Sequence, residues 1–226
     1  MQNLYNNATS RPYWNYFSMD GVFMFKLLRR MMALFFVLAA LYSFSLIRDR
    51  RLLNDQVIRL HVVGASNSTE DQSIKLSVRD AILERIKTLT ADSTAKAEVQ
   101  QILADNLDLL KEIANTVLRK AGMEQRAQVT LQKESFETRE YDTFTMPAGV
   151  YDSLRIVIGD GEGKNWWCVV FPSLCNATAS TEVEDVAVSA GLSEDLSKSI
   201  TRENGYEVRF FFLDWLGRLQ NFAKEH

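Results

Sequence analysis

The feature that most constrains this chain is an apolar run near its start, residues 31–47 (MMALFFVLAALYSFSLI). Basic residues lie on both sides of it: Lys26, Arg29 and Arg30 before it, and Arg48, Arg50 and Arg51 after it. As a helix its 17 residues would span about 26 Å, slightly less than the ~30 Å hydrocarbon core of a bilayer. Because the run has basic flanks and no polar face, it is typical of a secretory signal or a single membrane anchor rather than a buried helix.

This leader fits a long signal core and a short membrane anchor equally well. Ser43 and Ser45 are the best pair for a cleavage site, although they form a weaker signal than Ala-x-Ala. Residues 1–23 are rich in Asn and aromatic residues, with a single basic residue, which is unlike the beginning of a signal peptide. We therefore expect translation to begin at Met24 or Met19.

The charge of the chain divides it into two parts. Residues 1–53 hold seven of the 26 basic and two of the 29 acidic side chains, which leaves 19 and 27 in residues 54–226, a net charge of −8. So acidic a domain has no general attraction for nucleic acid or for an anionic membrane surface. We expect residues 1–53 to be a leader and residues 54–226 to be one extracytoplasmic domain. Hydrophobic residues make up 46% of the chain, which excludes a disordered protein.

Two cysteines, Cys168 and Cys175, lie close together in the acidic domain. An even, closely spaced pair outside the cytoplasm predicts a disulfide bond, and Pro172 can turn the chain back between them. Two free buried thiols are the alternative. The pair is not a metal site by itself, because zinc needs about four ligands.

The first half of the domain predicts one buried strand followed by two helices. Residues 57–63 (VIRLHVV) are β-branched and apolar, which favours a strand. Ser68 is placed to cap a helix that continues to Leu89, because apolar residues recur there at three- to four-residue spacing. A second long helix is expected over residues 97–121, with Gly122 at its C-terminal cap.

The second half predicts several strands and a closing helix. Alternation at residues 127–131 indicates a strand, and residues 154–158 and 166–171 are expected to form an antiparallel hairpin around a glycine-rich loop. Residues 176–205 are expected to be a mobile acidic insertion with at most one weak helix. A strand at residues 206–210 then leads into a short helix. The predicted fold class is α+β: a mostly antiparallel sheet with two long helices on one face, preceded by the signal or anchor helix.

The sequence holds no recognisable catalytic constellation, and we expect no catalytic residue, no cofactor and no metal ion. His61 lies inside a predicted strand, where a hydrogen-bonded structural imidazole is the expected role. The glycines that precede Lys164 lack the Walker spacing and are followed by a strand rather than a helix, so they indicate a turn and not a phosphate loop. The many carboxylates show no spacing that would bring two of them together for catalysis.

The adjacent tryptophans and several charged residues indicate contact with another protein. Adjacent side chains of a strand point to opposite faces, so one indole of the Trp pair should enter the core and the other should face solvent or a partner. The predicted contact residues lie on the first helix and in the hairpin: Glu70, Asp71, Arg79, Asp80, Asn165, Trp166 and Trp167. Ordinary surface charges, and two tryptophans that are both covered, are the alternatives.

Four segments of the domain resemble the stage II sporulation protein R family of endospore-forming bacteria. They are RLHVVGASN at residues 59–67, EDQSIKLSVRDA at residues 70–81, PAGVY at residues 147–151 and LRIVIGDGEGKNWWCVVFPSLC at residues 154–175. The resemblance covers residues 57–175, the leader and, weakly, the C-terminal strand and helix. Where the family often has Pro-Pro, this chain has Pro172 and Ser173. Residues 1–23 and 176–205 have no counterpart in the family pattern.

The resemblance implies a signalling protein rather than an enzyme. Proteins of this family are made in the forespore and exported across its membrane toward the mother cell. There they trigger a membrane-embedded aspartic protease, which removes the inhibitory pro-sequence from the sporulation sigma factor sigma-E. The implied partner is the membrane protease and not the sigma factor or nucleic acid. An exported hydrolase with a carboxylate pair, acting on cell wall or peptide, is the alternative from another class, and a tethered structural protein is a third.

Overall fold

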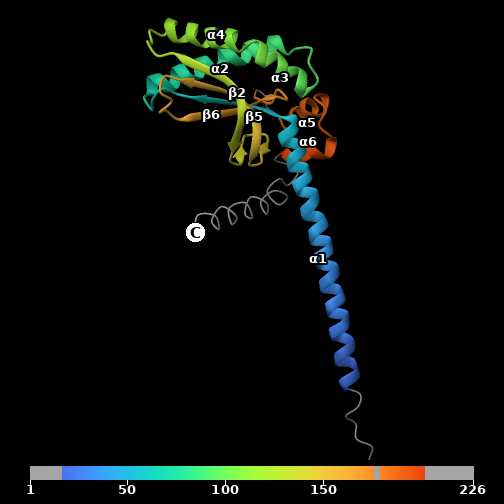
Figure 1. The fold of residues 1–226 in the computed structure, drawn as a ribbon. Coiled ribbons are helices and arrows are strands. Elements are labelled where there is room, and N and C mark those ends of the chain that lie inside the picture. The colour runs from blue at the N-terminus through green and yellow to red at the C-terminus, as the bar shows by residue number, and fades with distance from the viewer. Residues whose placement is uncertain (1–16, 176–178, 202–226) are drawn as a thin grey trace, which may run out of the picture. The chain divides into compact units, whose positions relative to one another are not determined.

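The computed structural model describes residues 17–175 and 179–201 (Figure 1). The chain forms two compact units, residues 1–45 and 46–226. The described part of the first unit lies in helix α1 (Phe17–Gln56), and its apolar side chains from Phe23 to Phe44 are largely exposed. Over Phe23–Gln56 this helix is long and apolar enough to cross a membrane. The predicted N-terminal apolar helix is therefore present.

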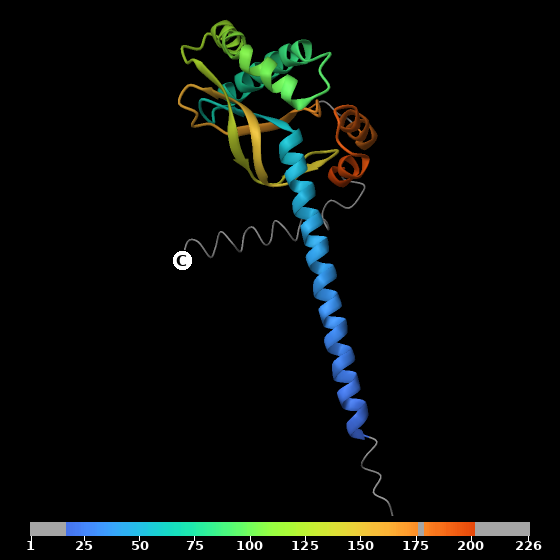
Figure 2. The same cartoon turned by 45° about the vertical axis from the view of Figure 1, so that its right-hand side comes forward.

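The second unit is built on a four-stranded sheet in the order β2-β5-β1-β6. Its strands are β1 (Ile58–Val63), β2 (Ala127–Phe136), β5 (Gly149–Ile158) and β6 (Asn165–Phe171). Strands β1 and β5 are parallel, whereas the β2–β5 and β1–β6 pairs are antiparallel. Helices α2 (Thr69–Leu89), α3 (Lys96–Asp105) and α4 (Leu107–Lys120) cover one face of this sheet (Figures 1 and 2). The predicted α+β class, with a mostly antiparallel sheet, is confirmed.

The predicted hairpin between residues 154–158 and 166–171 is wrong, because β1 lies between these two strands. All six residues of β1 are buried, and a strand buried on both faces is best placed where both its edges are paired. The loop from β5 to β6 must therefore cross the end of β1. Gly163 allows this crossing: its N–H donates to the carbonyl of Gly64 at 2.9 Å, and a Cβ there would collide with the carbonyl oxygen of Ser66.

The helices follow the predicted pattern with one interruption. Ser68 caps α2, since its side chain accepts a hydrogen bond from the N–H of Asp71. The second long helix is divided into α3 and α4 at Asn106, whose side-chain amide donates to the carbonyl of Ile102 at 2.8 Å. Asn competes for backbone groups in this way, which explains the break. Gly122 has a φ of 75° just after α4, as expected of a C-terminal cap.

The other face of the sheet is partly covered by a second apolar cluster. It involves the short strands β3 (Arg139–Glu140) and β4 (Thr145–Met146) and the helices α5 (Ser180–Ser189) and α6 (Glu194–Ile200). Where the sequence predicted a mobile insertion with one weak helix, the described residues 179–201 form these two helices. The buried apolar side chains of this segment are Val183, Ala187, Leu192, Leu196 and Ile200. The strand and helix predicted for residues 206–219 lie outside the described residues.

A buried carboxylate joins three elements of the domain. Asp152 of β5 bonds Lys96 of α3 at 2.5 Å and Lys133 of β2 at 3.3 Å, and the Lys96 ammonium also donates to the carbonyl of Asn54. Burial alone would raise the pKa of Asp152, but the hydrogen bond and charge of Lys96, with those of Lys133, outweigh it. The pKa of Asp152 therefore lies below its ordinary value of 3.8.

We expect Asp152→Asn to lower the free energy of unfolding by about 3 kcal/mol, because it leaves Lys96 enclosed without a counter-charge. Since the pKa is depressed in the folded state, this contribution is fully present above the ordinary pKa and is lost as pH falls through the folded value. Urea unfolding of the full chain in detergent at several pH values measures both effects. Lys133→Ala removes only the exposed partner of Asp152 and should lower the free energy of unfolding by less than about 1 kcal/mol. A loss as large as that of Asp152→Asn would contradict the assignment of Lys96 as the main partner.

Candidate partner interface

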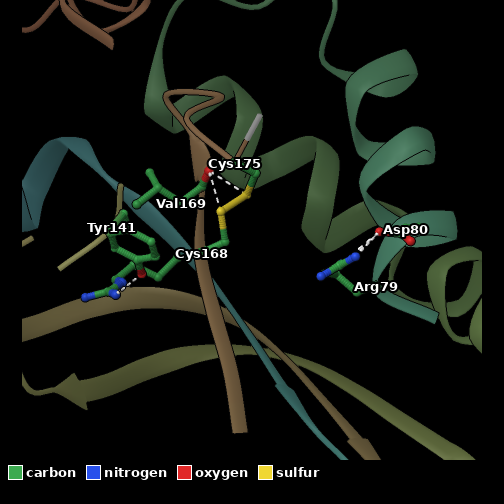
Figure 3. Close-up of a disulfide and its surroundings, with 7 residues drawn as sticks. Arg79, Asp80, Tyr141, Cys168, Val169 and Cys175 are labelled. Carbon is green, nitrogen blue, oxygen red and sulfur yellow. Dashed lines mark hydrogen bonds and ion pairs between the residues drawn. A yellow bond between two sulfur atoms is a disulfide. The ribbon is translucent and has the colours of Figure 1, made fainter. Parts of the chain in front are cut away.

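The predicted contact residues of α2 and β6 meet along one edge of the sheet. The Arg79 guanidinium lies 4.7 Å from the ring centroid of Trp166, and its Nη2 bonds Asp80 Oδ1 at 2.6 Å (Figure 3). Trp166 also packs against the core beneath the helices. These three residues therefore form one group, with Asp80 on its exposed side.

Trp167 lies on the opposite face of β6, in a stack of three side chains. The ring centroids of Trp167 and His61 are 5.5 Å apart, and the two ring planes meet at 20°. The guanidinium of Arg139, which belongs to β3, lies 3.7 Å from the centroid of the Trp167 ring. Both tryptophans are thus half-buried, and an arginine covers each. The two indoles lie on opposite faces as expected, but neither is fully buried or fully exposed, because each face of this strand meets a neighbouring element.

Glu70 and Asp71 lie apart from the Arg79 group, in the first turn of α2. Asp71 accepts hydrogen bonds from the Ser66 hydroxyl and lies beside the Ser68 cap, so its role is to shape the turn between β1 and α2. Glu70 is exposed. Nine residues of helix, about 13 Å, separate Asp71 from Asp80, so the predicted residues form two groups rather than one.

The first-turn group adjoins the glycine-rich loop. Lys164 donates its N–H to Asn67 Oδ1 at 2.9 Å, and the buried Lys75 ammonium donates to the Lys164 carbonyl at 2.9 Å. Burial, with the charges of Arg79 and Lys164, lowers the pKa of Lys75. The loop is therefore held against the start of α2. It crosses the end of β1 and does not form the hairpin turn that was expected at these glycines.

His61 has the structural role that was predicted. Its Nδ1 lies 2.8 Å from Glu134 Oε1, and its Nε2 lies 2.9 Å from Asn165 Oδ1. Arg155 also donates to Glu134, at 3.1 Å. The side chain of Asn165 therefore holds the imidazole of His61, while its backbone begins the edge strand β6.

Sequence analysis missed Arg59, the largest fully buried side chain of the described domain. Its guanidinium lies 4.2 Å from the Phe136 ring centroid and 5.3 Å from that of Tyr151, and Nη2 donates to the Tyr141 hydroxyl at 2.7 Å. Burial raises the pKa of Tyr141, although the Arg59 charge acts in the opposite direction. An arginine inside a strand that is otherwise apolar except for His61 was the available signal.

The predicted disulfide joins Cys168 and Cys175, whose Cα atoms are 5.6 Å apart (Figure 3). It holds the loop at residues 172–174 against β6, where Leu174 donates its N–H to the carbonyl of Val169 at 3.3 Å. Next to the disulfide, a shallow pocket lies between this loop and α2. Its walls include Asp80, Glu84, Val170, Ser173 and Cys175.

The described residues include several partly or fully buried carboxylates, and two carboxylates, Asp80 and Glu84, line the same pocket. Among the described residues, no three His, Cys, Asp or Glu side chains gather as metal ligands. Glu134 and Asp152 each bond cations, and the register of β2 and β5 places them on opposite faces of the sheet.

Replacing both Cys168 and Cys175 with Ser should lower the free energy of unfolding by about 2–3 kcal/mol, because the short cross-link no longer restricts the unfolded chain. Urea unfolding of the oxidised wild type and the double variant measures the difference. Reducing the wild type should reproduce the variant's stability. An unchanged midpoint in the variant would show that the loop is held without the disulfide.

Comparison with known proteins now adds to this geometry. The family model for stage II sporulation protein R matches residues 54–181. The stage II sporulation protein R of Bacillus subtilis (strain 168) is 34% identical to the chain over 186 residues, which cover 74% of this chain and 83% of that protein. No solved structure matches. These matches support a sporulation role, and they show that the chain belongs to the stage II sporulation protein R family.

Proposed function

We propose that this protein is an exported sporulation signal. It is made in the forespore, crosses the forespore membrane and activates a membrane-embedded aspartic protease of the mother cell. That protease then removes the pro-sequence of sigma-E. Residues 31–47 either are cleaved as a signal or keep the protein anchored to the membrane, and the domain acts in the space between the two cells.

The observation that carries this proposal is the exposed apolar helix that precedes a disulfide-bonded domain. Helix α1 has the length and hydropathy of a membrane span, and its flanks are basic. Disulfides persist in oxidising compartments outside the cytoplasm, so the Cys168–Cys175 bond supports delivery of the domain across a membrane. The family assignment supplies the sporulation context.

Activation by a ligand needs a difference in affinity. A signal that binds the active arrangement of the protease more tightly than the inactive one shifts the population toward activity by that difference. The edge strand β6 supports such a role, because Trp166 lies under Arg79 on one of its faces and Trp167 under Arg139 on the other. Aromatic and arginine side chains commonly dominate the binding energy of protein interfaces.

The direct test is co-expression of the full chain with the candidate protease and pro-sigma-E in a host that lacks all three. We expect the shortened sigma factor only when the chain carries its leader and the protease has its catalytic aspartates. A chain without residues 17–47 should fail, since it stays on the wrong side of the membrane. Processing without the chain, or equal processing by the leaderless chain, would contradict the proposal.

The double variant Trp166→Ala/Trp167→Ala should reduce processing by about tenfold or more, because truncating two aromatic anchors commonly costs over 2 kcal/mol of binding. Immunoblots of exported protein and of sigma factor measure export and activation together. Replacing both tryptophans with Phe keeps the arginine–aromatic packing and should preserve most of the activity. Full activation by the double alanine variant would remove this surface from the proposal.

A further inference from the structure

We propose that β6 binds an extended segment of the partner protein by strand addition, at the open stretch from Asn165 to Cys168. The inference rests on the proposed function, since it names how the signal would contact the protease. Edge strands offer unpaired N–H and C=O groups, and partner segments commonly add to them as a further strand.

The hydrogen-bond register shows which backbone groups of β6 point outward. Gly64 donates its N–H to the carbonyl of Lys164, which is one bond of a hydrogen-bonded antiparallel pair and continues the register of β1 and β6. Such pairs alternate along the strand, which directs Trp166 and Cys168 toward β1 and Asn165 and Trp167 away from it. Val169 lies two residues beyond Trp167, so its carbonyl should also point away from β1. The hydrogen bond that this carbonyl accepts from the Leu174 N–H agrees with that register.

The open stretch is bounded and short. Beyond Cys168, the loop at residues 172–174 covers the edge and the disulfide holds it there. Within the described residues, no strand pairs with the outer side of Asn165 or Trp167. Among residues 17–175 and 179–201, the outer side of β6 is therefore closed at one end by a fixed loop and unpaired at Asn165 and Trp167.

The second edge strand, β2, shows what a protected edge in this protein looks like. It carries Lys133 and Glu134 at mid-strand, and charged side chains on an edge discourage pairing with another chain. Strand β6 (NWWCVVF) has no charged residue. Its flanking cations, Arg79 and Arg139, instead lie over the two tryptophans, one on each face.

The pocket beside the edge indicates the chemistry of the added segment. Asp80 and Glu84 lie one helical turn apart on its wall, with Lys87 farther along, and Ser173 closes the other side. In the part of the chain that the structure describes, Glu84 has no ion pair. A segment that follows the edge toward the covering loop would reach this pocket with a side chain, and the Glu84 carboxylate favours a lysine or arginine there, since Asp80 is already paired with Arg79.

Proline tests the edge without a change of fold, because it is tolerated in edge strands where the N–H faces solvent. Asn165→Pro removes the outward N–H and the amide, whereas Asn165→Ala removes only the amide that holds His61. Ser135→Pro is the matched control on β2, because the N–H of Ser135 also points away from the sheet. Ser135 lies an even number of residues from Ala127, whose N–H donates to Asn115 and not to β5. In the co-expression assay we expect Asn165→Pro to lower processing about tenfold below Asn165→Ala, and Ser135→Pro to leave it unchanged.

A second readout does not depend on the identity of the partner. The full chain, with a photo-crosslinking amino acid in place of Ser173, is irradiated in sporulating cells, and the crosslinked peptide is sequenced. We expect a crosslink to a basic extended segment of the protease. Asn165→Pro should abolish this crosslink and Ser135→Pro should retain it, whereas Glu84→Gln should lower its yield about two- to tenfold.

The outcomes separate the two proposals. A crosslink to a different protein that Asn165→Pro abolishes would keep strand addition at β6 and overturn activation of the protease. Processing or crosslinking that is equal in Asn165→Pro and Asn165→Ala would overturn strand addition, even if the protease is the partner. A crosslink to a second copy of this chain would also overturn it, because the edge would then serve self-association.

Discussion

The domain depends on one constraint: β1 is buried on both faces and hydrogen-bonded on both edges. A strand in that position requires its neighbours in sequence to go around it. Helices α2–α4 lead from its end to β2 and β5, and the glycine-rich loop then crosses that same end to place β6 on the far side. The open edge of β6, the separation of the two tryptophans and the close packing of Gly163 all follow from this arrangement.

Polar side chains on a buried strand also need partners, and this requirement organises the second face of the sheet. His61 bonds Glu134 and Asn165, while Arg59 lies among aromatic rings and bonds Tyr141. These contacts bring β2, β3 and β6 to the same place. The position of Trp167, stacked between His61 and Arg139, therefore results from the same packing that buries the core.

Local sequence patterns were sufficient to predict the apolar N-terminal helix, α2 with its Ser68 cap, and the structural role of His61. The spacing of the two cysteines was sufficient to predict the disulfide. Strand order was not predictable in this way, because glycines between two strands indicate a turn but not whether a third strand lies between them. Arg59 and the arginines over the tryptophans were missed for a related reason. Their partners are distant in sequence, so no local pattern records the contact. Helices α5 and α6 were underestimated because their few apolar residues are decisive only once packed.

The account stands on delivery of the folded domain to the outside of the cell that makes it, where its disulfide is stable and a receptor can bind the surface of α2 and β6. Fusion of a phosphatase that is active only outside the cytoplasm to the C-terminus of the full chain tests this directly in sporulating cells. The account predicts phosphatase activity that disappears when residues 31–47 are deleted. An inactive phosphatase on a stable, full-length fusion would place the domain in the cytoplasm and contradict the account.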